Sequence, residues 1–180
     1  MSCYSGPHEV TSGLIGYWDP GNTKSYSGSG LTLYDLSIYN KNMGLSSITP
    51  VYTNPYITYN GTSNQWAQST VPVTLTTAFT VSTWCRILST PTNFATVFGG
   101  GVQGCTIQNN SGTVNQIGGW AGIGGIGYYT TYYTYSLNIW YNFQFTWSSG
   151  DYLRFYVNGI QTNISASTVT GTLNAPTTFK

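Results

Sequence analysis

Strict alternation of apolar and polar side chains is the feature of this sequence that most restricts its fold. In residues 139–147 every second position is apolar or aromatic, at Ile139, Tyr141, Phe143, Phe145 and Trp147. The positions between them carry Trp140, Asn142, Gln144 and Thr146. Residues 78–88 and 152–160 alternate in the same way. Because successive side chains of a strand point to opposite faces, each segment predicts a strand with one buried face.

Turn signals join these segments. Residues 148–151, SSGD, connect two of them at a length typical of a hairpin. Asn158-Gly159 is the strongest short hairpin signal, because both central residues of a type I′ turn need a positive φ, so another strand is expected from Ile160. Helical spacing of apolar positions is not found. We therefore predict an all-β, antiparallel two-sheet sandwich. Further strand candidates are residues 13–18, 56–60, 95–101 and 104–110.

A glycine-rich run, GIGGIGYYTTYYTY at residues 122–135, has the glycine spacing of a dinucleotide-binding fingerprint. That motif binds a pyrophosphate only where it follows a strand and opens a helix. The aromatic and β-branched residues after Gly127 disfavour a helix. The run is therefore interpreted as a loop or a bent strand in which glycine allows close backbone approach. Trp120 either packs as an anchor or is displayed at a loop tip, and packing is favoured.

Charged side chains are scarce. Lys, Arg, Asp and Glu make up 5% of the chain and the net charge is +1, whereas about 25% is usual in soluble domains. Such a protein has no field to attract phosphate backbones, which argues against nucleic-acid binding. No apolar run is long enough for a membrane span. The surface must consist of hydroxyl, amide and aromatic groups, which suit contact with uncharged sugars or a place inside an assembly.

The length of 180 residues suits one domain. We predict an N-terminal arm at residues 1–12 and a single domain at residues 13–180. The opening residues lack the basic and apolar regions of a signal peptide, so synthesis in a host cytoplasm and release by lysis are expected. Three scattered cysteines, Cys3, Cys85 and Cys105, allow one disulfide and leave one thiol over.

Groups suited to catalysis or metal binding are few. The acids are Glu9, Asp19, Asp35 and Asp151, and His8 is the only histidine. Asp19 and Asp35 are interpreted as caps of turns. Glycoside hydrolysis needs two neighbouring carboxyl groups, and no such cluster is evident, so an enzyme is not predicted. Isolated carboxylates supply little charge for calcium, so no cofactor is predicted, with calcium kept as an alternative.

Four segments carry a family resemblance: GLIGYWDPGNTKSYSGSGLTLYDLS (13–37), YNGTSNQW (59–66), FTVSTWCRI (79–87) and SLNIWYNFQFTWSSGDYLRFYVNGI (136–160). Together they resemble concanavalin A-like (laminin-G-like) lectin/glucanase domains of tailed bacteriophages. The resemblance implies a jelly roll of two antiparallel sheets, found in virions as a capsid decoration, fibre or tail module. Members of that family continue with a further strand after the region of residues 170–180. Either a neighbouring chain supplies this closing strand, or the edge is left exposed, or the strand lies outside these 180 residues; a neighbouring chain is favoured, because an unpaired edge promotes aggregation.

These observations predict a structural virion protein on the virion surface. Its expected partners are other virion proteins, copies of itself and host surface glycans. A secreted microbial carbohydrate-binding module is the alternative, and a glycosidase of the same fold is disfavoured by the shortage of acids. Ring chemistry and position select six candidate glycan-binding residues: Trp66, Trp120, Tyr128, Tyr129, Tyr132 and Tyr133. For the tyrosines of residues 128–135, alternation between core and surface or contact with a protein partner is favoured over stacking on sugar rings.

Overall fold

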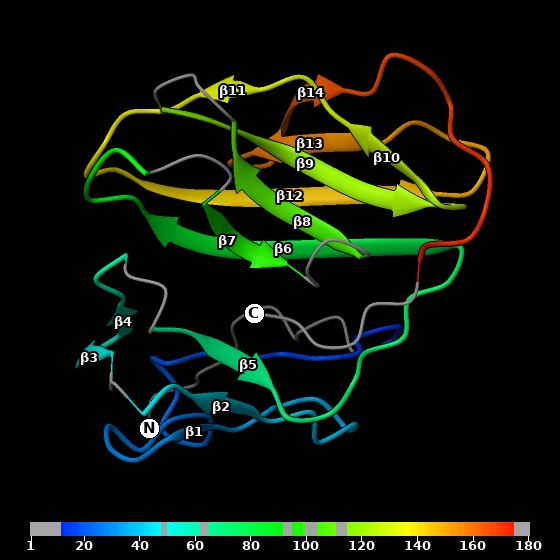
Figure 1. The fold of residues 1–180 in the computed structure, drawn as a ribbon. Coiled ribbons are helices and arrows are strands. Elements are labelled where there is room, and N and C mark those ends of the chain that lie inside the picture. The colour runs from blue at the N-terminus through cyan, green and yellow to red at the C-terminus, as the bar shows by residue number, and fades with distance from the viewer. Residues whose placement is uncertain are drawn as a thin grey trace, which may run out of the picture. The chain divides into compact units, whose positions relative to one another are not determined.

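The computed structural model describes residues 12–47, 50–61, 65–91, 95–99, 104–110 and 115–174. Within these ranges the regular structure consists of β-strands, and no helix there is long and apolar enough to cross a membrane. The chain divides into two compact units, residues 1–71 and residues 72–180, which are described separately (Figure 1). The prediction of one domain from residue 13 stays a prediction, and the predicted arm lies almost wholly outside the described residues.

Unit 1 contains short strands. β1 (Thr32–Leu33), β2 (Met43–Leu45) and β5 (Ala67–Ser69) form one antiparallel sheet, and β3 (Val51–Thr53) pairs with β4 (Tyr56–Thr58). β4 confirms the strand expected at residues 56–60. The buried apolar side chains of this unit include Tyr26, Leu33, Met43 and Leu45. These few side chains make a small core, so hydrogen bonds contribute much of the stability of this unit.

The predicted strand at residues 13–18 is wrong, because these residues form no strand. The Tyr17 N–H donates to Oδ1 of Asp35 at 2.8 Å, and the Trp18 indole N–H donates to the Lys41 carbonyl at 2.8 Å. A side-chain carboxylate thus takes the backbone donor that a neighbouring strand would otherwise have bonded. The alternating pattern contained no signal for that long-range partner.

The first sheet of unit 2 contains the predicted hairpins. Its strands are β6 (Ala78–Arg86), β12 (Trp140–Ser148), β13 (Arg154–Val157) and β14 (Ile160–Ile164), in the order β14-β13-β12-β6. Asn158 and Gly159 have φ of 51° and 80°, which confirms the expected turn between β13 and β14. The antiparallel pairing of β12 with β6 extends from Trp140–Arg86 to Ser148–Ala78.

The second sheet contains the glycine run. Its strands are β7 (Thr96–Gly99), β8 (Cys105–Asn109), β9 (Gln116–Ile123) and β10 (Ile126–Tyr129), in the order β10-β9-β8-β7, and β11 (Tyr133–Thr134) also pairs with β9. β7 and β8 confirm the strands expected near residues 95–101 and 104–110. The run itself is a hairpin of β9 and β10 that turns at Gly124 and Gly125, with φ of 58° and 84°.

The two sheets of unit 2 pack face to face, as two layers in Figure 1. Side chains from both inner faces are completely buried, among them Ile107, Ile117, Phe143, Phe145 and Phe155. Gly119 of β9 lies directly against the Phe145 ring of β12, so that a Cβ atom there would overlap the ring. The predicted antiparallel two-sheet sandwich is therefore confirmed, with aromatic rings filling the space between the sheets.

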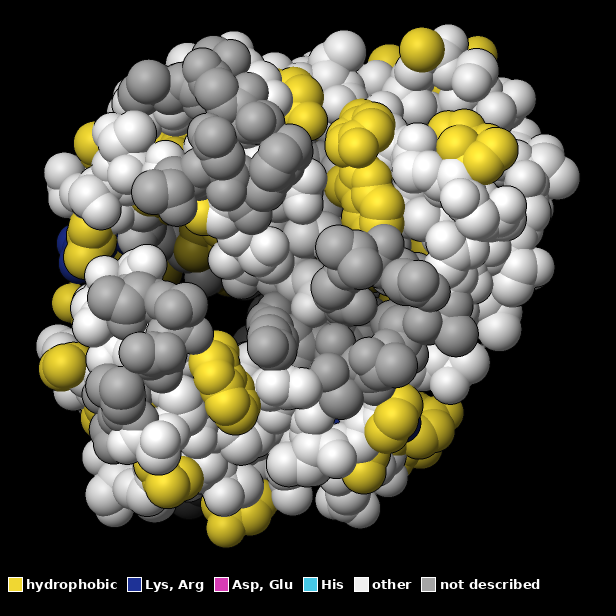
Figure 2. Space-filling view, in the orientation of Figure 1, with side chains coloured by type: hydrophobic (Ala, Val, Ile, Leu, Met, Phe, Trp, Pro, Cys, Tyr) yellow, Lys and Arg dark blue, Asp and Glu magenta, His cyan; other side chains and the backbone are white. Residues whose placement is uncertain are grey.

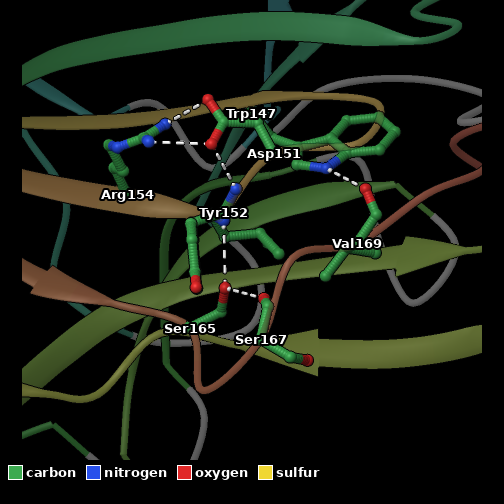
Figure 3. Close-up of polar contacts among 8 residues, drawn as sticks. Trp147, Asp151, Tyr152, Arg154, Ser165, Ser167 and Val169 are labelled. Carbon is green, nitrogen blue, oxygen red and sulfur yellow. Dashed lines mark hydrogen bonds and ion pairs between the residues drawn. The ribbon is translucent and has the colours of Figure 1, made fainter.

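Residues 165–174 connect the ends of both sheets. Val169 pairs with Asp151 beside β13, and Leu173 pairs with Ile123 of β9, each as a single bridge. The Trp147 indole N–H donates to the Val169 carbonyl at 3.1 Å, which holds this segment against β12 (Figure 3). The expectation that a neighbouring chain adds a closing strand is not tested by these contacts and stays a prediction.

The Cys85 and Cys105 thiols are both free, and burial raises the pKa of each to about 12. Cys3 lies outside the described residues. Cys105 is buried and Cys85 is half-buried, and since the thiolate is the reactive form, we expect neither thiol to react with a disulfide reagent at pH 8 while the chain is folded. In a Cys3→Ser variant, titration with Ellman's reagent should detect both thiols only after guanidinium is added. Rapid labelling of either thiol without denaturant would contradict the burial described here.

Candidate functional site

The six predicted glycan-binding residues do not form a single cluster. Trp66 belongs to unit 1, where it is half-buried and immediately precedes β5. The other five lie in unit 2, on β9, β10, β11 and the residues between the last two strands. Because strand side chains alternate, these five are divided between the two faces of the sheet. Only the residues on the outer face can meet a ligand there.

Tyr128 and Tyr133 belong to the inner face. Tyr128 is paired with Ala121, and Tyr133 is paired with Ile117; both partners are completely buried. The Tyr133 ring meets the Tyr141 ring of β12 edge to face, with centroids 6.1 Å apart. The tyrosines therefore alternate between core and surface, as one of the two interpretations of this segment predicted.

The remaining three, Trp120, Tyr129 and Tyr132, lie on the outer face and are called here the β9 aromatic cluster. Trp120 is directly opposite Tyr129, and their ring centroids are 6.5 Å apart at an interplanar angle of 58°. Trp120 and Tyr132 are half-buried, and Tyr129 is 49% exposed. Figure 2 shows hydrophobic side chains gathered where Figure 1 draws β9 and β10. Trp120 is thus a partly packed strand residue and not a ring at a loop tip.

Glycines form the surface under these rings. A Cβ atom on Gly127 would lie 2.8 Å from Nε1 of Trp120, and one on Gly118 would lie 2.9 Å from Cδ1 of Tyr132. Because both positions lack a side chain, the neighbouring rings can lie directly against the backbone. This contact holds the rings in place and leaves their other surfaces available to solvent.

A β-bulge places Tyr132 in the cluster. Tyr129 pairs with Trp120 and Tyr133 pairs with Ile117, so three residues of the edge, 130–132, are opposite two residues of β9. Thr130 fills the irregular position: its hydroxyl oxygen accepts from the Gly119 N–H at 3.0 Å, and its own N–H donates to the Gly119 carbonyl at 3.0 Å. The additional residue reverses the alternation and turns Tyr132 outward.

The cluster is electrically neutral. Burial, and secondarily the nearby Tyr129, raise the pKa of Tyr132 above its ordinary value, so that its phenol stays protonated at physiological pH. The rings offer apolar faces together with one indole N–H and two phenolic hydroxyls, which can donate and accept hydrogen bonds. This chemistry fits an uncharged, hydroxylated ligand better than an ionic one.

The described carboxylates accept hydrogen bonds from backbone N–H groups and, at Asp151, from an arginine. Asp19 accepts from the Gly21 N–H at 2.9 Å, as expected of a turn cap. Asp151 receives both guanidinium N–H groups of Arg154, at 2.6 and 2.8 Å, and the Tyr152 N–H at 2.7 Å (Figure 3). These bonds, led by the one from Arg154, lower the pKa of Asp151. Over the described part of the chain, no three potential metal-ligating side chains lie together.

The sequence analysis did not identify a second surface that carries exposed aromatic rings. Trp84 of β6 is 66% exposed and Trp140 of β12 is 39% exposed, and both lie on the outer face of the first sheet. Alternation within each segment had already placed each indole on the polar face of its strand. The missing information was the pairing of β6 with β12, which brings the two polar faces together.

Comparison with known proteins identifies the family of this sandwich. A sequence model of the concanavalin A-like lectin/glucanases superfamily matches residues 60–179, more than half of the 180-residue chain. No curated protein matches the chain. The matched region includes all of unit 2 except its last residue, and the antiparallel sandwich found there agrees with the family assignment. The chain therefore belongs to the concanavalin A-like lectin/glucanases superfamily.

Proposed function

We propose that this protein is a non-catalytic recognition protein that binds uncharged glycans through the β9 aromatic cluster. The observation that carries the proposal is the outward pair of Trp120 and Tyr129, held against a glycine-rich backbone with centroids 6.5 Å apart. Sugar rings have an apolar C–H face that stacks on an aromatic ring, while their hydroxyls bond to indole and phenol groups. A ring pair already fixed by the fold loses little conformational freedom on binding.

We further propose that the protein is displayed on the surface of a tailed-phage virion. The resemblance of residues 13–37 and 136–160 to virion modules supports this location, and so does the net charge of +1, which gives little repulsion between neighbouring copies. Other virion proteins and copies of this chain would be its protein partners. Mass spectrometry of purified virions tests the location. If the protein binds glycans but is absent from the particles, it is better described as a secreted carbohydrate-binding module.

The absence of enzymatic activity is part of the proposal. Among the described residues, Asp19 caps a turn, Asp35 accepts hydrogen bonds from the Tyr17 and Lys41 N–H groups, and Asp151 is held by Arg154, so each carboxylate is engaged in a structural contact. Incubation with a laminarin-type β-glucan tests this, and release of reducing sugar that scales with protein concentration would overturn it. An Asp35→Ala variant that abolished such release would assign the activity to this chain.

Loss of the Trp120 ring should weaken glycan binding. A neutral-glycan array identifies a ligand, and titration of that ligand measures its Kd. We expect Trp120→Ala to weaken binding by about tenfold or more, because truncating an aromatic anchor commonly costs over 1 kcal/mol. Tyr39→Ala, which removes an exposed ring from unit 1, is the control and should leave the Kd unchanged. An array without any bound neutral glycan, or equal Kd values for wild type and Trp120→Ala, would refute glycan binding at this cluster.

A further inference from the structure

The outer face of the β6–β12 pair combines indole rings with amide and hydroxyl groups. We call it the indole–amide face; it comprises Ser82, Trp84, Arg86, Trp140, Asn142 and Gln144. In the strand register Arg86 is opposite Trp140, Trp84 is opposite Asn142, and Ser82 is opposite Gln144. Successive rows on one face of a sheet are about 6.6–6.8 Å apart, so these three rows extend over roughly 13 Å.

The two indoles are diagonal neighbours at one end of this face. Residues so placed in an antiparallel pair are about 7–8 Å apart. The Arg86 guanidinium lies 5.5 Å from the centroid of the Trp140 ring, a cation–π arrangement that holds that ring. Trp84, with 66% of its surface exposed, is the more accessible ring. The other outward side chains of β6 are polar: Thr80, Ser82 and Arg86. A large apolar ring exposed to water among them indicates a contact surface.

The polar half of the face is ordered by hydrogen bonds. The Asn142 amide donates to the Ser82 hydroxyl at 3.1 Å, and the Gln144 amide donates to Oδ1 of Asn142 at 2.8 Å. The Asn142 N–H donates to Oδ1 of Asn158 at 2.9 Å, and the Asn158 N–H donates to the Asn142 carbonyl at 2.9 Å. Asn142 is buried by these contacts. The chain of amides is thus fixed before any ligand arrives, which lowers the entropic cost of binding.

We propose that the indole–amide face is a second glycan-binding site and that it takes an extended, neutral polysaccharide of β-linked pyranoses. Such sugars carry equatorial hydroxyls, so their rings are flat enough for a C–H face to stack on Trp84. Hydroxyls at the ring edge both donate and accept hydrogen bonds, as do the Gln144 amide and the Ser82 hydroxyl. The site and the β9 aromatic cluster lie on the outer faces of two sheets packed against each other, so neither depends on the other.

The chemistry of the face favours a glycan over a protein partner. A docking surface for a protein would present a continuous apolar centre with a polar rim. Here Trp84 and Trp140 are at one end, the amide ladder continues from them along the strands, and Tyr156 of β13 is opposite Gln144 at the other end. This order, with ring contacts beside a row of neutral donors and acceptors, matches a chain of linked sugars lying along the face.

The full-length chain should be titrated with cellohexaose and with laminarihexaose, two neutral β-linked hexasaccharides, while binding is followed by calorimetry. Wild type is expected to bind at least one of them. Trp84→Ala should weaken that binding by about tenfold, as truncation of an aromatic anchor commonly does. Gln144→Leu, similar in size but without the amide, should weaken it as well. Ile160→Ala, which removes an exposed apolar side chain outside the face, should have no effect.

The outcomes separate this site from the proposed function. If Trp84→Ala weakens binding and Trp120→Ala does not, the second site is supported whatever the β9 aromatic cluster binds. If only Trp120→Ala weakens binding, the indole–amide face is not a glycan site and the proposed function stands. Absence of binding by wild type to both hexasaccharides overturns this inference. A change in oligomeric mass in Trp84→Ala, measured by light scattering without any glycan effect, would show instead a protein interface.

Discussion

Replacing Gly119 by alanine is expected to destabilise unit 2 by about 2–3 kcal/mol, near the upper end of the usual cost of overpacking a core. Gly119 belongs to β9, and a Cβ atom there would overlap three carbon atoms of the Phe145 ring. Phe145 is completely buried, so its ring has no solvent-filled space into which it could rotate. Either the ring leaves its preferred rotamer or the two sheets move apart. Valine, with two more carbon atoms, should cost more and should prevent a stable fold.

A double-variant cycle makes this prediction specific. Phe145→Leu removes the ring that occupies the space, so Gly119→Ala should cost clearly less in that background than in wild type. Gly44→Ala of β2 is a suitable control, because a Cβ atom there would have no neighbour nearer than 3.9 Å. Guanidinium unfolding followed by far-ultraviolet circular dichroism measures each variant. Equal stability of wild type and Gly119→Ala would show that the sheets are not packed as described.

Asp35→Ala should destabilise unit 1 by about 3–4 kcal/mol, because it leaves several part-buried donors without an acceptor, at roughly 1–3 kcal/mol for each donor that water does not reach. The carboxylate accepts from the N–H groups of Tyr17, Ser37 and Lys41, each at 2.8 Å, and from the Ser37 hydroxyl at 2.7 Å. The side chain is 7% exposed. Asp35 therefore orders the loop at residues 35–41 and connects it to Tyr17, in a unit whose strands are only two or three residues long.

The same residue predicts how stability depends on pH. Burial by itself raises the pKa of Asp35, but the hydrogen bonds from Ser37, Tyr17 and Lys41 together outweigh it and lower the pKa below its ordinary value of 3.8. The pKa of Asp35 is therefore lower in the folded state than in the unfolded state. The stability that its ionised carboxylate contributes is present above the ordinary pKa of 3.8 and is lost as the pH falls through the folded-state pKa. Wild type should therefore lose more stability than Asp35→Asn between pH 5 and pH 2.

Urea unfolding at several pH values tests both statements. Asp19→Asn is the matched control, since Asp19 lies in the same unit and, among the described residues, its carboxylate accepts one backbone N–H, from Gly21 at 2.9 Å. It should cost much less than Asp35→Ala at pH 7. The account of Asp35 fails if the two variants are equally stable, or if Asp35→Asn has the same pH dependence as wild type.

The sandwich could be predicted from the sequence because the patterns that specify its strands and turns lie within short segments. Alternation in residues 139–147 and 152–160 sets which side chains are buried, and Asn158-Gly159 sets the turn, all within a few residues of one another. The strand expected at residues 13–18 failed for the opposite reason. Its backbone is held by Asp35, eighteen residues beyond Tyr17 in the chain, and apolar spacing contains no signal for a side-chain partner so distant.

The candidate site was predictable only in part. Trp120, Tyr129 and Tyr132 share a face as a glycan site would require, while Tyr128 and Tyr133 are turned to the inner face and Trp66 belongs to unit 1. Regular alternation after Tyr129 would have placed Tyr133 outward and Tyr132 inward. The bulge at residues 130–132 reverses this order, because one additional residue moves every following side chain to the other face.

Local sequence patterns are enough to establish an antiparallel β-protein that contains few charged residues, because strand periodicity can be read from neighbouring residues and composition from simple counting. Which aromatic rings meet depends instead on contacts between segments that are far apart in the chain. Trp84 and Trp140 lie on one face because β6 and β12 pair although a long stretch of chain separates them. Tyr132 joins Trp120 because Thr130 takes the Gly119 N–H and offsets the strand. Both arrangements depend on hydrogen bonds between distant segments, which no local pattern encodes.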